Sequence, residues 1–114
     1  MEIDVISPQS LAAAAQEHGR IELIDVRTPA EFCEAHIPAA RNVPLDQLDP
    51  AAIRRQRQGS GEPLYVVCHL GMRSQQACEI LAAAGLTKVV NVAGGTQAWA
   101  EAGLPLVFHG PVDG

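Results

Sequence analysis

The sequence has few aromatic residues, few cysteines and no long apolar run, and each shortage excludes a class of protein. Phe, Trp and Tyr together number four in 114 residues, so the core must be built from aliphatic side chains and alanine. Three cysteines, an odd number, form neither a disulfide framework nor a zinc pattern, which fits a reducing compartment. Neither a membrane-spanning run nor a signal-peptide pattern is visible. We therefore expect a cytoplasmic protein with no membrane partner.

Basic residues are also scarce. Eight Lys and Arg against 13 Asp and Glu give a formal net charge of −5, which argues against nucleic acid as a partner. Arg54, Arg55 and Arg57 cluster weakly, and this pattern favours a solvated helix face. With 47% hydrophobic residues, the chain has the composition of one folded domain. We expect that domain at residues 1–108, followed by a loose tail at 109–114.

Short apolar segments alternate with helical patterns along the chain. Helix-start signals precede several of the helical patterns, such as Ser7-Pro8 and the capping box of Thr28-Pro29 with Glu31. The alternation predicts an α/β fold with three layers, in which a five-stranded, mostly parallel sheet lies between helices. The strands are expected at residues 2–6, 21–26, 41–43, 64–67 and 88–92.

The stretch 64–74 combines a strand, a tight loop and the start of a helix. Leu64 to Val67 are apolar without alternation, which is typical of a strand buried on both faces. A helical spacing of apolar residues begins near Ser74, so we expect its side chain to cap the helix. Cys68 is thereby placed at the carboxyl end of a central strand, which is the edge where open α/β sheets bind ligands.

The expected surroundings of Cys68 favour a reactive thiolate. Main-chain N–H groups of the loop would face the sulfur as a nest, and the helix dipole adds about half a positive charge. Arg73 adds a full charge, and a thiol in such a field ionises readily and becomes a nucleophile. The alternative interpretation is a small apolar residue at the end of a buried strand. Gly71, Arg73 and the following helix favour the reactive thiol.

The other side chains of the loop allow more than one interpretation. The guanidinium fork of Arg73 suits an oxyanion, although it could instead pair with a carboxylate of its own helix. His69 adds positive charge or moves a proton, or is simply exposed, and the sequence leaves these roles open. Leu70 and Met72 are expected at the loop rim, where they offer an apolar surface to an acceptor protein.

Four further residues are weighed for roles near the loop. Asp25 and Arg27 end a strand at the same sheet edge, where a structural ion pair supporting the loop is the favoured interpretation. Cys33 and Cys78 fall within helical patterns. For both, a buried small apolar residue is favoured over a resolving cysteine.

Taken together, the motifs resemble the single-domain rhodaneses, a family of sulfurtransferases. Two alanines depart from the family pattern, because many members have glycine at the positions of Ala35 and Ala39. If either position needs positive φ, alanine costs about 1 kcal/mol. The resemblance extends from about Ile3 to Leu106 and is carried, in order, by LIDVR at 23–27, EF at 31–32, HIPAA at 36–40, NVPL at 42–45, CHLGMRS at 68–74, GG at 94–95 with Trp99, and GLP at 103–105.

The resemblance implies a specific chemistry for the loop cysteine. In rhodaneses this residue takes a sulfane sulfur from a donor such as thiosulfate, holds it as a persulfide and passes it to cyanide or a thiol. By its position in the motif, the loop cysteine of this sequence is Cys68. The resemblance implies that the N–H groups from His69 to Ser74 surround the persulfide and that Arg73 faces the anionic donor. No cofactor and no metal are implied.

Two other functions remain open at this point. One is a sulfur relay, in which the domain exchanges sulfur with a partner protein. The other is a cysteine phosphatase or arsenate reductase on the same architecture, whose loop has one residue more between cysteine and arginine. Only four residues separate Cys68 from Arg73. The shorter loop would enclose a narrower anion-binding site, which matches one sulfur atom better than a phosphoryl group.

Overall fold

A computed structural model of the chain describes residues 2–57 and 60–109. Within them the sheet has five strands in the order β1-β5-β4-β2-β3, and every neighbouring pair is parallel. The predicted fold class is thereby confirmed. The strands are β1 (Asp4–Ile6), β2 (Glu22–Asp25), β3 (Arg41–Asn42), β4 (Leu64–Val67) and β5 (Val89–Val92), and the helices are α1 (Pro8–His18), α2 (Pro29–Glu34), η1 (Leu45–Gln47, a 3₁₀ turn), α3 (Pro50–Gln56), α4 (Met72–Ala83) and α5 (Gly95–Glu101).

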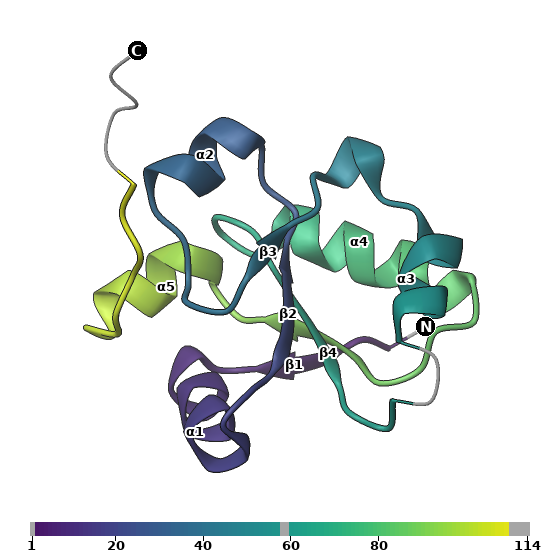
Figure 1. Cartoon of the computed structure of the whole chain (residues 1–114), viewed down its shortest axis with the longest axis horizontal. Coiled ribbons are helices and arrows are strands. Elements are labelled where there is room, and N and C mark those ends of the chain that lie inside the picture. The colour runs from purple at the N-terminus through teal and green to yellow at the C-terminus, as the bar shows by residue number, and fades with distance from the viewer. Residues whose placement is uncertain (1, 58–59, 110–114) are drawn as a thin grey trace.

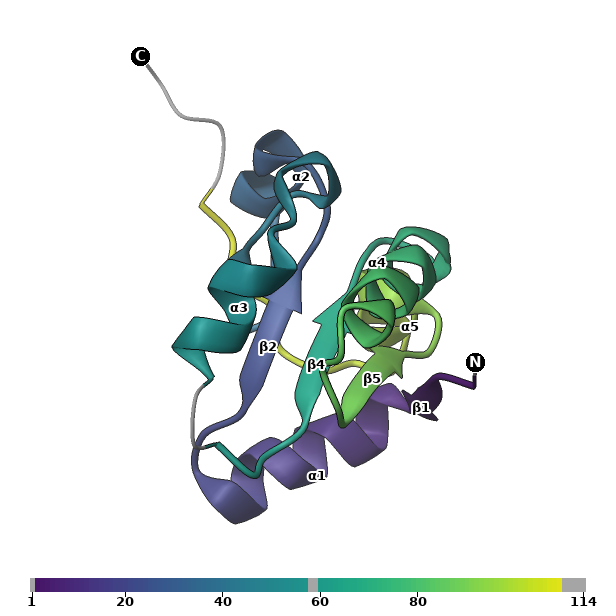
Figure 2. The same cartoon turned by 90° about the vertical axis from the view of Figure 1, so that its right-hand side faces the viewer.

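Helices cover both faces of the sheet (Figures 1 and 2). Alternate residues of β4 point to opposite faces. Leu64 and Val66 join one hydrophobic cluster with residues of α3 and α4, whereas Tyr65 and Val67 join a second with residues of α1 and α5. Because β4 must be apolar on both faces, its four residues form a continuous buried run, as the sequence predicted.

Local sequence signals fix several helix starts. Ser7 Oγ accepts a hydrogen bond from the Ser10 N–H at 3.1 Å. The Thr28–Glu31 capping box is present, with the Glu31 N–H donating to Thr28 Oγ1 at 3.2 Å and the Thr28 N–H donating to Glu31 Oε1 at 3.0 Å. These bonds satisfy N–H groups that have no partner within the first helical turn.

The two alanines that replace glycine adopt different backbone conformations. Ala39 has φ +73°, in the left-handed region, whereas Ala35 has φ −165° and is extended. The cost expected for alanine therefore applies to Ala39 alone.

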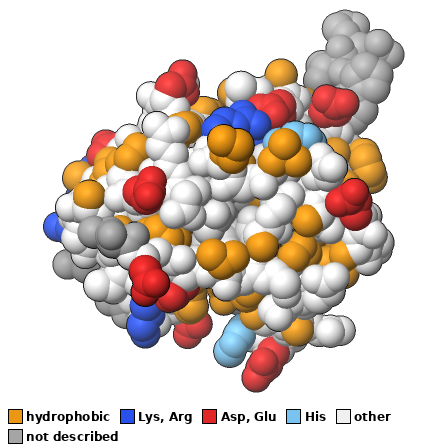
Figure 3. Space-filling view, turned by 180° about the vertical axis from the view of Figure 1, so that it is seen from behind, with side chains coloured by type: hydrophobic (Ala, Val, Ile, Leu, Met, Phe, Trp, Pro, Cys, Tyr) orange, Lys and Arg blue, Asp and Glu red, His pale blue; other side chains and the backbone are white. Residues whose placement is uncertain are grey.

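The described chain ends at His109, whose imidazole lies 5.0 Å from that of His36. The rest of the expected tail, residues 110–114, lies outside the described residues. None of the helices within residues 2–57 and 60–109 is long and apolar enough to cross a bilayer. Figure 3 shows acidic side chains spread over the back of the molecule, with basic side chains at only a few places.

All carboxyl ends of the parallel strands meet at one edge of the sheet. At this edge β4 leads into the loop before α4, and α2 lies above the ends of β2 and β4 (Figure 2). This arrangement brings the loop that begins at Cys68 close to residues of α2, α5 and β5.

Candidate active site

Cys68 directly follows β4 and is 1% exposed. Its sulfur accepts a hydrogen bond from the Gly71 N–H at 3.1 Å. Gly71 has φ +110° and stands just before the first residue of α4, so the loop curls back over the sulfur. A backbone turn of this kind directs successive N–H groups to one point and forms an anion-binding nest.

The structure corrects the expected role of Ser74. The helix α4 begins at Met72, so Ser74 lies in its first turn rather than at its cap. The serine is fully buried, and its Oγ lies 3.3 Å from Cys68 Sγ. Its hydroxyl donates to Asn91 Oδ1 at 2.5 Å. Ser74 therefore contacts the sulfur directly.

Asn91, on β5, was not anticipated from the sequence, and it holds both the serine and the loop. Its Nδ2 donates to the Gly71 carbonyl at 3.2 Å and to Gln75 Oε1 at 3.1 Å, and these two acceptors fix the orientation of the amide. Its Oδ1 must then accept from Ser74, which has a single hydroxyl proton. When Cys68 is a thiol, Ser74 can accept from it; when Cys68 is a thiolate, Asn91 and the sulfur compete for the serine proton.

The hydrogen bonds around Cys68 favour its ionised form. Burial acts in the opposite direction and raises the pKa of the thiol. Hydrogen bonds from the Ser74 hydroxyl and from the N–H groups of Ser74, Gly71 and Leu70 together outweigh burial, so the pKa of Cys68 lies below its usual value. The site thereby combines low solvent access with hydrogen bonds that lower the pKa of the thiol.

Arg73 points to a carboxylate that lies outside its own helix. Its Nη1 and Nη2 donate to Glu31 Oε1 and Oε2 on α2, at 2.8 and 3.0 Å. The hydrogen bond from Arg73 is the main reason that the pKa of Glu31 falls to about 2. The alternative that Arg73 pairs within α4 is thus wrong, and the guanidinium that was expected to face a donor is shared with Glu31.

The first turn of α5 supports the Cys68 loop from the other side. The N–H groups of Thr96 and Gln97 donate to the carbonyls of Cys68 and His69, at 2.8 and 3.1 Å. Gly95 allows this approach, because a Cβ at its position would lie 2.3 Å from the His69 oxygen and 2.4 Å from the Cys68 oxygen. Side chains other than glycine are therefore excluded at Gly95.

Asp25 and Arg27 form a buried ion pair beside the loop, which is the role favoured for them. Arg27 Nη2 lies 2.8 Å from Asp25 Oδ2 and also donates to the Ala35 carbonyl at 2.7 Å. The pair ties the end of β2 to the end of α2. Neither residue has a hydrogen bond to Cys68 among the described residues.

The two other cysteines have different environments. Cys78 is fully buried in the core, and burial, with smaller effects of the Cys68 and Glu79 charges, raises the pKa of its thiol to about 12. A thiol with so high a pKa is a poor nucleophile at neutral pH. Cys33 lies half-buried on α2.

The remaining loop residues face outward. Leu70 and Met72 are 55% and 82% exposed, and His69 is exposed as well. His69 also lines a groove of ≈530 Å³, which passes between α2 and α5 and includes the apolar Leu106 and Phe108. Phe108 is 71% exposed, so the groove beside the loop carries an exposed apolar side chain of its own.

Comparisons with known proteins show the family of the chain. A family model described as a rhodanese-like domain matches residues 7–102. A sulfurtransferase of Allochromatium vinosum is 34% identical over 105 residues, which are 92% of this chain and 95% of that protein. Thiosulfate sulfurtransferase GlpE of Vibrio cholerae is 31% identical over 107 residues, 93% of each chain.

A solved structure supports the same assignment. The crystal structure of a rhodanese-related protein from Thermoplasma volcanium is similar with a TM-score of 0.73 at 30% identity, and the match covers 91% of this chain and 97% of that one. The family model spans most of the chain, and the two relatives align over nearly their whole lengths. The chain therefore belongs to the rhodanese-like domain family.

Proposed function

We propose that the protein is a sulfurtransferase in which the Cys68 thiolate accepts a sulfane sulfur from an anionic donor such as thiosulfate. The observation that carries this proposal is the contact of Cys68 Sγ with the Gly71 N–H and the Ser74 hydroxyl, at 3.1 and 3.3 Å. The Gly71 N–H stabilises negative charge on sulfur in a buried place, where a hydrogen bond to a charged group is strong, and the Ser74 hydroxyl adds to this when its proton turns from Asn91 to the sulfur.

The proposed transfer has two steps. The Cys68 thiolate attacks the outer sulfur of thiosulfate, the S–S bond of the donor breaks, and sulfite leaves with the bonding electron pair. Cyanide or a thiolate then attacks the outer sulfur of the Cys68 persulfide, which gives thiocyanate or a new persulfide and restores the Cys68 thiolate. The atoms and charges balance without a cofactor or an external oxidant, and the scheme is that of covalent catalysis by an activated nucleophile.

The loop explains why the persulfide would be held rather than lost. After the first step the negative charge moves from Cys68 Sγ to the outer sulfur. The Gly71 N–H, which already donates to Cys68 Sγ, and the positive end of the α4 dipole would stabilise the charge there as well. Because Cys68 is 1% exposed, the loop would have to move for the donor to reach its sulfur.

In this scheme Arg73 draws the anionic donor to the loop. Its guanidinium is bound by Glu31, and both side chains are about one-third exposed, at 37% and 35%. A donor can therefore compete with Glu31 for Arg73 at the surface. A phosphatase would need the same guanidinium for its phosphoryl group, so the ion pair with Glu31 does not distinguish the two functions. The spacing of four residues between Cys68 and Arg73 is what favours sulfur transfer.

A second candidate is a relay that exchanges sulfur with a partner protein. The exposed Leu70 and Met72 and the groove that includes Leu106 and Phe108 favour it, since apolar surface beside a reactive loop suits protein contact. In a relay, Leu70→Ser and Met72→Ser would slow transfer to a protein thiol and leave the formation of thiocyanate from thiosulfate unchanged.

The experiment that tests the main proposal measures thiocyanate formed from thiosulfate and cyanide. The wild-type protein and Cys33→Ser should be active with ping-pong kinetics, whereas Cys68→Ser should lose the activity. An active Cys68→Ser protein would refute the proposal. Hydrolysis of a phosphate ester, measured on the same samples, should stay at background, and hydrolysis that depends on Cys68 would favour a phosphatase instead.

A further inference from the structure

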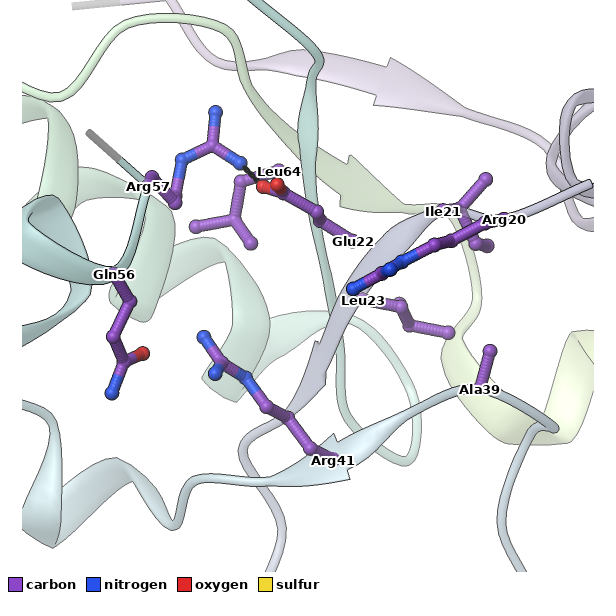
Figure 4. Close-up of a pocket in the computed structure, with 9 residues that line it drawn as sticks. All are labelled: Arg20, Ile21, Glu22, Leu23, Ala39, Arg41, Gln56, Arg57 and Leu64. Carbon is purple, nitrogen blue, oxygen red and sulfur yellow. Dashed lines mark ion pairs between the residues drawn. The ribbon is translucent and has the colours of Figure 1, made fainter. Parts of the chain in front are cut away.

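Three arginines gather around a hollow at the edge of the sheet opposite Cys68. Arg20 precedes β2, Arg41 belongs to β3 and Arg57 follows α3. The hollow has a volume of ≈250 Å³, and we call it the arginine hollow. Figure 4 shows its lining residues, which are Arg20, Ile21, Glu22, Leu23, Ala39, Arg41, Gln56, Arg57 and Leu64.

Arg57 is the buried cation of this hollow and already has a partner. It was expected on a solvated helix face, but its side chain is only 10% exposed and it pairs with Glu22 of β2. Its Nη2 also donates to the Glu62 carbonyl at 2.6 Å. Burial lowers the pKa of the Arg57 guanidinium, as expected for a charge removed from water.

Arg20 and Arg41 have no such partner. Within residues 2–57 and 60–109, neither lies within ion-pair distance of a carboxylate. In Figure 4 their guanidinium ends turn from two sides toward the middle of the hollow. Glu22 is the one carboxylate in the lining, and Glu62 lies beyond Arg20 in an adjoining hollow. The lining therefore carries more positive than negative charge, in a protein with a formal net charge of −5.

We propose that the arginine hollow binds a small tetrahedral oxyanion, either a free phosphate or sulfate ion or the phosphate group of a small ester. Like charges that face one hollow repel each other, and a bound dianion would relieve that repulsion. The guanidinium groups of Arg20, before β2, and of Arg41, on β3, can contact different oxygens of a tetrahedral group, each as a strong charge-assisted hydrogen bond. Gln56 adds an amide that can donate as well.

The size and place of the hollow limit what this site can do. Its volume is below the range of about 300–1,000 Å³ that drug-sized ligands need, so the ligand is small. Leu64, which lines the hollow, begins β4, and Cys68 follows the end of that strand, roughly 13 Å farther along. An anion in the hollow therefore cannot contact Cys68, and the site is separate from the one proposed for the sulfur donor.

The test measures binding of inorganic phosphate by calorimetry and by the rise in melting temperature, at an ionic strength held constant with chloride. We expect saturable binding of phosphate and of sulfate, and much weaker binding of acetate, which is planar and singly charged. Arg20→Ala and Arg41→Ala should each weaken phosphate binding about tenfold, the effect of losing one charged hydrogen bond. Both residues are exposed, so both variants should fold.

Two matched control variants distinguish binding at the arginine hollow from binding at other arginines. Arg55→Ala removes an exposed arginine of α3 outside the lining, and Arg73→Ala removes the arginine of the Cys68 loop. Arg55→Ala should bind phosphate as the wild type does, and Arg73→Ala should keep the phosphate binding that depends on Arg20 and Arg41. Tighter binding of glycerol 3-phosphate than of phosphate would identify an ester as the ligand, and equal binding a free ion. Absence of saturable binding, unchanged binding in Arg20→Ala and Arg41→Ala, or loss of binding in Arg73→Ala would each overturn the proposal.

Discussion

Arg73 and Glu31, which are 42 residues apart in the sequence, form a bidentate ion pair that joins the Cys68 loop to α2. The same Glu31 completes the capping box at the start of α2. One carboxylate thus fixes a helix start and restrains the guanidinium proposed to attract the donor.

Replacing Glu31 by glutamine should make Arg73 more available to thiosulfate. The neutral amide competes less well than a carboxylate for the guanidinium, and we expect the KM for thiosulfate to fall roughly fivefold, the equivalent of about 1 kcal/mol for a solvent-exposed pair. Arg73→Ala should raise KM instead. Initial rates at varied thiosulfate concentration check both, and an unchanged KM in Glu31→Gln would contradict the proposed competition.

The same substitution should lower stability by about 1 kcal/mol or less at neutral pH, because the pair is partly exposed. The pKa of Glu31 is about 2 in the folded protein, compared with 4.5 for an unperturbed carboxyl, so its stabilisation is complete above pH 4.5 and disappears as the pH falls toward 2. Urea unfolding of the wild type and Glu31→Gln at several pH values should show the difference shrinking over that range. A difference that persists at pH 2 would exclude the ion pair as its cause.

Ser74→Ala should raise the pKa of the Cys68 thiol, since the serine hydroxyl contributes most among the hydrogen bonds that lower it. The variant should therefore be alkylated by iodoacetamide more slowly at neutral pH. Peptide mass spectrometry over time distinguishes Cys68 from Cys33, and Cys78 should stay unmodified in the folded protein. Equal or faster alkylation of Cys68 in Ser74→Ala would show that the hydroxyl does not stabilise the thiolate.

Gly95→Ala should distort the Cys68 loop. The added Cβ would lie 2.3–2.4 Å from main-chain oxygens of His69 and Cys68, which cannot move without moving the loop. The positive φ of this residue adds backbone strain. We expect the variant to lose about 2 kcal/mol or more of its free energy of unfolding and most of its transfer activity. Gly103→Ala is the matched control: its φ is also positive, at +75°, but a Cβ there meets nothing within 4 Å. Gly103→Ala should lose about 1 kcal/mol of its free energy of unfolding and keep its transfer activity. Equal activity of Gly95→Ala and Gly103→Ala would contradict this account of Gly95.

Ala39→Gly should stabilise the fold by about 1 kcal/mol, because Ala39 has φ +73°, where glycine is not strained. Ala35→Gly is the matched control, since φ −165° suits any residue. Ala35→Gly should leave the stability unchanged or lower it, because glycine at this position only increases the conformational entropy of the unfolded chain. Thermal unfolding of the two variants checks the difference, and a less stable Ala39→Gly protein would contradict the prediction.

Much of this architecture was predictable because its signals are local. The strand Leu64–Val67, the capping box at Thr28 and the position of Cys68 between a strand and a helix each depend on a few neighbouring residues. The start of α4 was misplaced because Gly71, rather than a side chain, precedes the helix. Ser74 has the chemistry of a cap, but it lies inside the first turn.

The contacts that complete the site depend on distant residues. Glu31 reaches Arg73 from α2, and Asn91 reaches Ser74 from β5. Each pair is brought together by the order of strands in the sheet, which the sequence does not specify residue by residue. Arg57 was assigned to a solvated face for the same reason, because its partner Glu22 belongs to another element. An isolated polar residue on a predicted strand, such as Asn91, is the one signal that could have indicated the network.

The most direct test of the central claim is the intact mass of the protein after incubation with thiosulfate and removal of excess reagent. The wild type and Cys33→Ser should gain the mass of one sulfur atom, cyanide should remove it, and Cys68→Ser should gain nothing. A gain that persists in Cys68→Ser, or no gain in the wild type, would contradict the assignment of Cys68 as the residue that carries the sulfur.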